Sequence, residues 1–172
     1  MSYTEIFAFK KTGEIESIAE IRNSHRGAAA VWSTVEDRYL PKKQYSRIVL
    51  SEMQDIWDLW KRDDVSLTDK IVLLSTFDHV IVEKEHIPRL IAAFRAFVGQ
   101  TSLPEQADAI AKIQDDPDLW AIGWNQTSIN SDDWTNLGGY DEETDEPIPY
   151  DFKTGELHWR LFSFEEKPTK DQ

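Results

Sequence analysis

Residues 119–134 read LWAIGWNQTSINSDDW, and the rest of the chain is best understood outward from this stretch. It opens with an apolar run that predicts a strand over Leu119 to Trp124, and it continues into polar residues that predict a loop. Side chains two apart on a strand share a face, so Trp120, Ile122 and Trp124 are expected on one side.

Trp134 is flanked by Asp133 and Thr135 at the polar end of the same stretch. Exposed Trp is enriched where proteins bind partners, so we expect this side chain to be exposed or to line a pocket. The alternative is that Trp134 pins its loop to the domain. By contrast, Trp32, Trp57 and Trp60 recur at helical spacing and are expected in the core or half in it.

Most of the negative charge lies beside this stretch. Residues 104–151 contain 13 Asp and Glu against one basic residue, Lys112, while the remainder has 19 acidic and 18 basic residues, in a chain of net charge -13. A local field of one sign can steer a basic partner. The sequence pI near 4.7 argues against binding a nucleic-acid backbone, which requires clustered Lys and Arg.

Length and composition predict one domain. A chain of 172 residues can bury a core without staples, and we expect a domain over 1–165, a long acidic loop at about 131–150 and a frayed tail at 166–172. The absence of Cys excludes disulfides and thiol chemistry and suits a reducing compartment. The N-terminus lacks the features of a signal peptide and no apolar run is long enough to span a membrane, so a cytoplasmic location is expected.

The expected elements define an α+β class with a mainly antiparallel sheet of about five strands and four or five helices. The run Gly27 to Ala30 lacks bulk and predicts close approach of its helix to a sheet. Residues 66–74 fit either a helix or a buried strand. Expected strands are 3–9 and 14–21 as a hairpin, 80–83, 119–124 and 157–164; expected helices are 28–39, one from Ser51, one from Pro88 to Gly99, and 103–113.

No motif assigns a catalytic or metal site. The four His residues show no metal-ligand spacing, and no nucleophile elbow, P-loop or dinucleotide motif occurs. Asp132-Asp133 and Asp141-Glu142-Glu143 offer oxygen ligands, but their spacing does not match a calcium loop, so a solvated acidic loop is the simpler interpretation. We therefore expect no catalytic residues, metal or cofactor.

The chain resembles a family of uncharacterised small acidic proteins of Gram-positive bacteria and their phages. The matching stretches are YTEIFAF, RGAAAVW, FRAF with TSLPEQADAI, and AIGWNQTSIN with DDW. This resemblance implies a phage-type, cytoplasmic accessory context, and it implies no activity and no site residue.

The sequence therefore predicts a non-catalytic protein-binding module that meets a basic surface on another protein through an acidic, Trp-bearing surface. The expected binding residues are Trp124, Asn125, Gln126, Asp132, Asp133, Trp134, Asp141, Glu142 and Glu143. Two alternatives remain: a metal-dependent hydrolase that gathers Asp132, Asp133 and Asp141 with His158, and a structural protein that self-associates.

Overall fold

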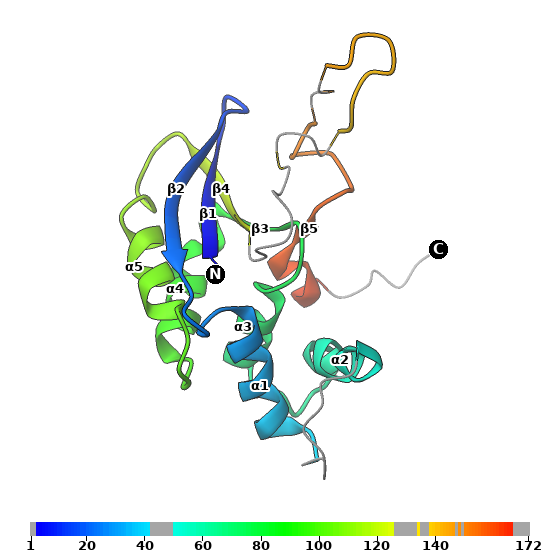
Figure 1. Ribbon diagram of the computed structural model, residues 1–172. Helices are drawn as coiled ribbons and strands as arrows, with labels where there is room; N and C mark the ends of the chain where they lie inside the picture. Colours follow the sequence, from blue (N-terminus) through cyan, green and yellow to red (C-terminus); the bar gives the residue numbers. More distant parts are fainter. Residues whose placement is uncertain are drawn as a thin grey trace.

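The computed structural model describes residues 3–41, 50–125, 134, 138–146, 148 and 150–166 (Figure 1). The expected frayed tail at 166–172, apart from Glu166, and part of the expected acidic loop lie outside these residues. The elements are β1 (Tyr3–Lys10), β2 (Ile15–Arg22), α1 (Ala28–Tyr39), α2 (Leu50–Trp57), η1 (Asp58–Lys61), α3 (Leu67–Leu74), β3 (Val80–Glu83), η2 (Lys84–His86), α4 (Ile87–Ala96), α5 (Leu103–Ala111), β4 (Leu119–Asn125), β5 (Trp159–Arg160) and η4 (Leu161–Glu165).

The five strands form one sheet in the order β2-β1-β4-β3-β5. β1 pairs antiparallel with β2 and with β4, and β3 pairs antiparallel with β4. β5 pairs parallel with β3, so the sheet is mixed but mainly antiparallel. The predicted α+β class is confirmed, as is the hairpin, whose turn contains Gly13 at φ 94°.

Local signals mark the start of two helices. Residues 67–74 form a helix and not a strand, because the Ser66 Oγ caps its N-terminus by accepting a hydrogen bond from the Asp69 backbone N–H. Pro88 lies in the first turn of α4, where a missing N–H costs nothing.

The predicted strand at 157–164 is wrong over most of its length. Only Trp159 and Arg160 pair with β3, and the chain then turns into η4. A strand would send Leu161 and Phe162 to opposite faces, whereas the tighter turn buries both.

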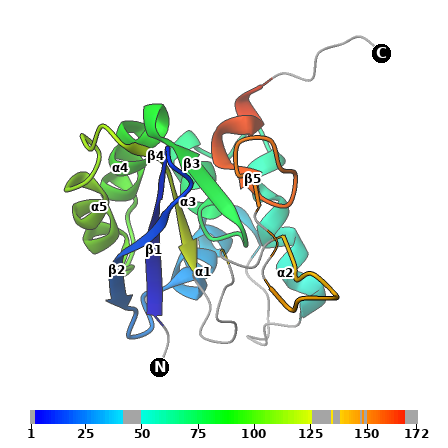
Figure 2. The same ribbon diagram turned by 90° about the horizontal axis from the view of Figure 1, so that it is seen from above.

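The two faces of the sheet carry cores of unequal size. The larger core joins the helices to side chains such as Ile6, Val82 and Ile122. The smaller core lies on the other face and contains Phe9, Ile81, Ala121, Trp134 and Phe152. Figures 1 and 2 show α4 and α5 along one face of the sheet.

Candidate functional site

The two tryptophans expected to anchor a partner are buried. Trp134 is 1% exposed and Trp124 is 3% exposed, so the expectation that Trp134 is exposed or lines a pocket is wrong. The Trp134 ring packs edge-on against Phe9 at 5.0 Å between centroids, and its indole N–H donates to the Trp124 carbonyl at 3.2 Å. Trp134 thus pins its segment to the domain, which was the alternative interpretation.

The strand that carries Trp124 also departs from simple alternation. Ile122 and Trp124 face the larger core, but Trp120 packs against the smaller one. The register of β4 against β1 shifts between Phe9 and Lys10, opposite residues 119–121. This irregularity moves Trp120 to the opposite face from the one expected.

Among the other expected binding residues, Asn125 ends β4 and is half-buried. Gln126, Asp132 and Asp133 lie outside the described residues. Nothing in the structure tests whether these positions contact a partner, so the binding site that the sequence suggests stays a prediction.

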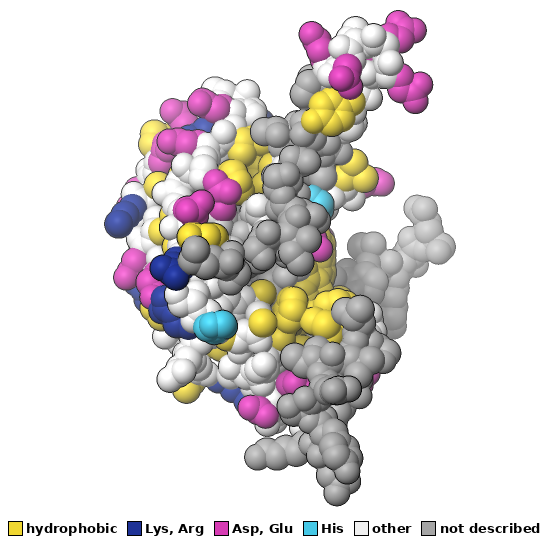
Figure 3. All heavy atoms as spheres, in the orientation of Figure 1, with side chains coloured by type: hydrophobic (Ala, Val, Ile, Leu, Met, Phe, Trp, Pro, Cys, Tyr) yellow, Lys and Arg dark blue, Asp and Glu magenta, His cyan; other side chains and the backbone are white. Residues whose placement is uncertain are grey.

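Asp141, Glu142 and Glu143 belong to an acidic tip, residues 138–146, that projects from the body of the protein (Figure 1). The Asp141 Oδ1 accepts hydrogen bonds from the backbone N–H groups of Glu143 and Thr144, both at 2.9 Å. These bonds stabilise the carboxylate and lower the pKa of Asp141. The carboxylates of the tip are exposed (Figure 3). The Asp141 carboxylate stabilises the turn through its hydrogen bonds to the backbone.

A pocket of about 1060 Å³ lies where the start of α1, α2 with η1, the turn between α3 and β3, and β5 converge. Figure 3 shows apolar side chains gathered in this region, between the positions that α1, α2 and β5 occupy in Figure 1. Ligand pockets are typically a few hundred to about 1,000 Å³ and mostly apolar, so this one has a suitable size. Its aromatic walls are Trp32, Trp57, Trp60, Phe77 and Trp159.

The rings of the pocket meet at steep angles. Trp32 and Trp57 lie 6.0 Å apart at 76°, and Trp60 and Trp159 lie 5.5 Å apart at 61°. The indole N–H of Trp32 donates to Thr76 Oγ1 at 2.9 Å, and that of Trp159 donates to Ser163 Oγ at 2.8 Å. Because these bonds satisfy the polar edges and fix the rings, an incoming group meets oriented apolar surface.

Charged groups lie at the edge of the pocket. The Lys61 ammonium is 2.7 Å from Asp58 Oδ1 and 5.6 Å from the centre of the Trp60 ring. This hydrogen bond is the main cause of the lowered pKa of Asp58. Asp78 also lines the pocket; it is exposed, and no ion pair joins it to another described residue.

The turn that leads into α1 is held by a buried hydrogen-bond network. Asn23 Oδ1 accepts from Thr4 Oγ1 and from Ser102 Oγ, both at 3.0 Å. A Cβ on Gly27 would lie 2.6 Å from the Asn23 side chain, so this position requires glycine. The following residues, Ala28 to Ala30, line the pocket, and α1 packs against α3 and α2.

The sequence interpretation missed this pocket because its tryptophans occur at core spacing. Trp32, Trp57, Trp60 and Trp159 are all half-buried, so the expectation of core or half-core positions holds for the three helical ones. The signal that was available is the pair Trp57 and Trp60 on two successive helices of only 8 and 4 residues. Spacing alone does not show that segments 20 to 130 residues apart converge.

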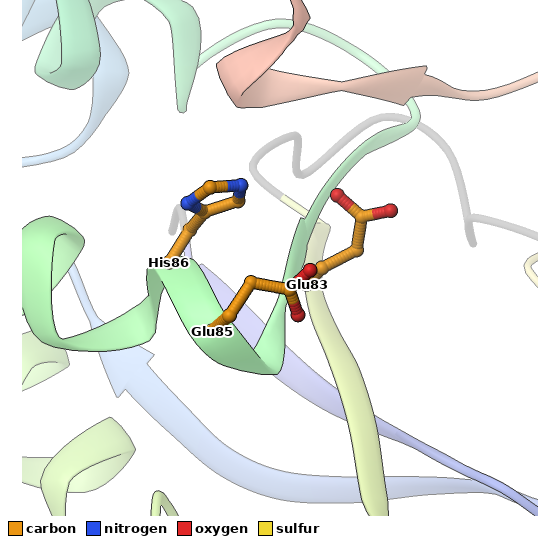
Figure 4. A group of neighbouring side chains, drawn as sticks. All are labelled: Glu83, Glu85 and His86. Carbon is orange, nitrogen blue, oxygen red and sulfur yellow. The ribbon is translucent and has the colours of Figure 1, made fainter.

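The described residues contain one group with the composition of a metal site: Glu83, Glu85 and His86, whose ligand atoms lie within 4.8 Å of one another (Figure 4). However, the Glu83 carboxylate accepts a 2.6 Å hydrogen bond from Arg160, and the His86 ring stacks on Phe162. A metal would have to displace Arg160, so we assign none here.

The residues expected for a hydrolase do not form such a group where the structure describes them. The Asp141 carboxylate accepts hydrogen bonds from the backbone of its own turn. His158 Nδ1 lies 2.9 Å from the Tyr150 hydroxyl. That hydroxyl also accepts from the Leu157 backbone N–H at 2.7 Å, and its own proton remains free for the bond to His158 Nδ1 when the ring is protonated at Nε2. Burial lowers the pKa of His158, and the nearby Arg160 charge adds to this effect.

Within the described ranges, no helix combines the length and the hydropathy that a membrane crossing requires. Comparisons with known protein families, with curated proteins and with solved structures found no match to this chain. The resemblance to small acidic phage-type proteins therefore stays a prediction, and the candidate site rests on the geometry of its own residues.

Proposed function

We propose that this protein is a non-catalytic binding module that captures a basic protein partner in the aromatic pocket. The observation that carries this proposal is the convergence of five aromatic side chains, from four separate segments, around a volume of about 1060 Å³. Aromatic residues dominate the energetics of protein interfaces because they bring a large contact area at a low entropy cost.

The polar groups of the pocket support binding more than catalysis. Thr76 Oγ1 donates to the Leu73 carbonyl and accepts from the Trp32 indole, so it is held in a structural role. No hydrogen bond joins His25 to a hydroxyl or carboxylate among the described lining residues. A nucleophile needs such a base within hydrogen-bond reach.

The acidic tip supports a basic partner. Its exposed carboxylates, those of Asp141, Glu142, Glu143, Asp145 and Glu146, project from the body and raise the local concentration of cationic chains. This charge accelerates the encounter, while the pocket supplies the contact that holds the complex.

The test is a peptide array with basic, neutral and acidic members, probed with fluorescently labelled protein. We expect the wild type to retain a subset of basic peptides and Trp57→Ala to lose them. Trp120→Ala is the matched control, since Trp120 is half-buried beside the smaller core and away from the pocket. Circular dichroism verifies that both variants fold. Equal retention by the wild type and Trp57→Ala, or no retention by the wild type, would refute the proposal.

A further inference from the structure

We infer that the pocket recognises a lysine-type side chain of the partner, with its ammonium group over the tryptophan rings and its apolar stem along them. This inference rests on the proposed binding function and names the chemical group that the pocket selects.

Indole rings are the best aromatic partners for cations. The face of the ring carries partial negative charge, and an ammonium within about 6 Å of its centroid is attracted to it. Four of the five aromatic walls are Trp, and the inter-ring angles of 76° and 61° let one bound group meet more than one ring.

The protein itself places one ammonium against this wall. Lys61 Nζ lies 5.6 Å from the Trp60 ring centre while it pairs with Asp58 at 2.7 Å. The combination of an indole and a carboxylate therefore already accommodates a lysine head group at the edge of the pocket. Because Asp58 balances Lys61, this internal cation does not leave net positive charge at the site.

The remaining charge of the lining favours a second cation. Asp78 lines the pocket, is exposed and has no ion-pair partner among the described residues. The chain as a whole carries a net charge of -13. The N-terminus of α1 also borders the pocket and would favour an anion, so the experiment includes a negatively charged competitor.

The size of the pocket indicates a side chain on a polypeptide and not a free small cation. A volume of about 1060 Å³ exceeds what one methylated ammonium group fills, and leaves room for flanking residues. A lysine can bury its four-carbon stem against apolar rings while its head group stays near a carboxylate. Methylation keeps the charge and adds apolar surface, so it should strengthen the contact.

The experiment uses the best peptide from the array as a fixed frame and varies one central residue: trimethyllysine, lysine, norleucine or glutamate. Norleucine has the lysine stem without its charge. Titration followed by the indole N–H signals of the full-length protein should show trimethyllysine binding about 5- to 30-fold more tightly than norleucine, with lysine between them. Asp78→Asn should reduce this ratio and leave norleucine binding unchanged, and the exposed Asp63→Asn is its control.

Each other outcome has a distinct meaning. Equal binding of lysine and norleucine would overturn the cation preference while leaving the pocket as a binding site. Tighter binding of the glutamate peptide would place an anion at the start of α1 and also overturn the inference. Choline chloride that binds as tightly as the trimethyllysine peptide would identify a free small cation as the ligand, against a protein side chain. Failure of every peptide in the array would remove the proposed function itself.

Discussion

Trp134 and the tryptophans of the pocket contrast in how the fold uses the same side chain. Trp134 is fully enclosed by Phe9, Phe152 and the neighbouring sheet, in the smaller core. Trp32, Trp60 and Trp159 rest against the edge of the larger core and stay half-exposed around a hollow. The loop residue Trp134 is thus structural, and the half-buried tryptophans form the candidate site.

This contrast has a physical origin. A sheet with helices on only one face leaves its second face uncovered, and the smaller core needs a large side chain from elsewhere in the chain to close it. Trp134 fills that role, and its indole N–H donates to the Trp124 carbonyl near the end of β4. The short helices α2 and η1 are too small to enclose several indoles, so part of each ring stays in contact with water.

The largest expected effect comes from Trp134→Ala. Removal of this enclosed ring leaves a cavity beside Phe9 and frees the Trp124 carbonyl, so we expect a loss of about 3 to 5 kcal/mol in the free energy of unfolding. Trp57→Ala removes a half-exposed ring and should cost about 1 kcal/mol. Urea denaturation of both variants measures the difference. Equal losses would break the contrast between structural and binding tryptophans.

Much of the fold follows from local sequence signals. The alternation in β1 and β2 with a turn at Gly13, the helix 28–39 that ends before Pro41, and the β-branched run of β3 each predicted the element found. These signals suffice because the elements are set by patterns within about ten residues. The short length of β5 was not predictable, because it depends on a partner strand that is only four residues long.

Little of the candidate site was predictable. The sequence located the acidic residues Asp141 to Glu143 on an exposed segment, since charge is a local property. Spacing did not reveal that Phe77 and Trp159 meet the indoles of α1 and η1, because that convergence depends on tertiary packing. The polar neighbours of Trp134 suggested that its side chain is exposed. It is buried because it packs into the smaller core, on the face of the sheet that the helices do not cover.

A second effect should come from Gly123→Ala in β4. A Cβ at this position would lie 2.8 Å from the Phe9 ring and 3.0 Å from the Trp134 ring, so the added methyl overpacks the smaller core. We expect a loss of about 1 to 3 kcal/mol in the free energy of unfolding, measured by urea denaturation. The double variant with Phe9→Leu should lose less than the sum of the single variants. Simple additivity would show that the rings around Gly123 yield without strain.

A smaller effect on the free energy of unfolding is expected from pH, through His158, the residue before Trp159. Burial lowers the pKa of His158 below its ordinary value of 6.5, and the Arg160 charge adds to this. The folded state therefore holds fewer protons than the unfolded state, so this contribution to stability is complete above pH 6.5 and declines as the pH falls toward the lowered value. Denaturation at pH 7.5 and 5.5 should show a greater loss for the wild type than for His158→Gln. The same loss in both proteins would contradict this assignment.

The smallest effect on stability should come from neutralising the acidic tip. The same variant should separate the association step from the contacts that hold the complex. Glu142, Glu143 and Glu146 are exposed, while the side chain of Asp141 shapes the turn, so the triple Glu→Gln variant keeps Asp141. Its free energy of unfolding should stay within about 0.5 kcal/mol of the wild type. The association rate with a basic peptide should nevertheless fall at low salt and match the wild type at high salt, because screening removes the steering field.

Stopped-flow kinetics with the basic peptide measure these rates. In the same measurement Trp57→Ala should show the opposite pattern, a nearly unchanged association rate and faster dissociation, because short-range ring contacts act only after the encounter. If neutralising the tip accelerates dissociation as much as Trp57→Ala does, the carboxylates touch the partner directly. The tip and the pocket would then form one continuous interface, and the division between steering and holding would be wrong.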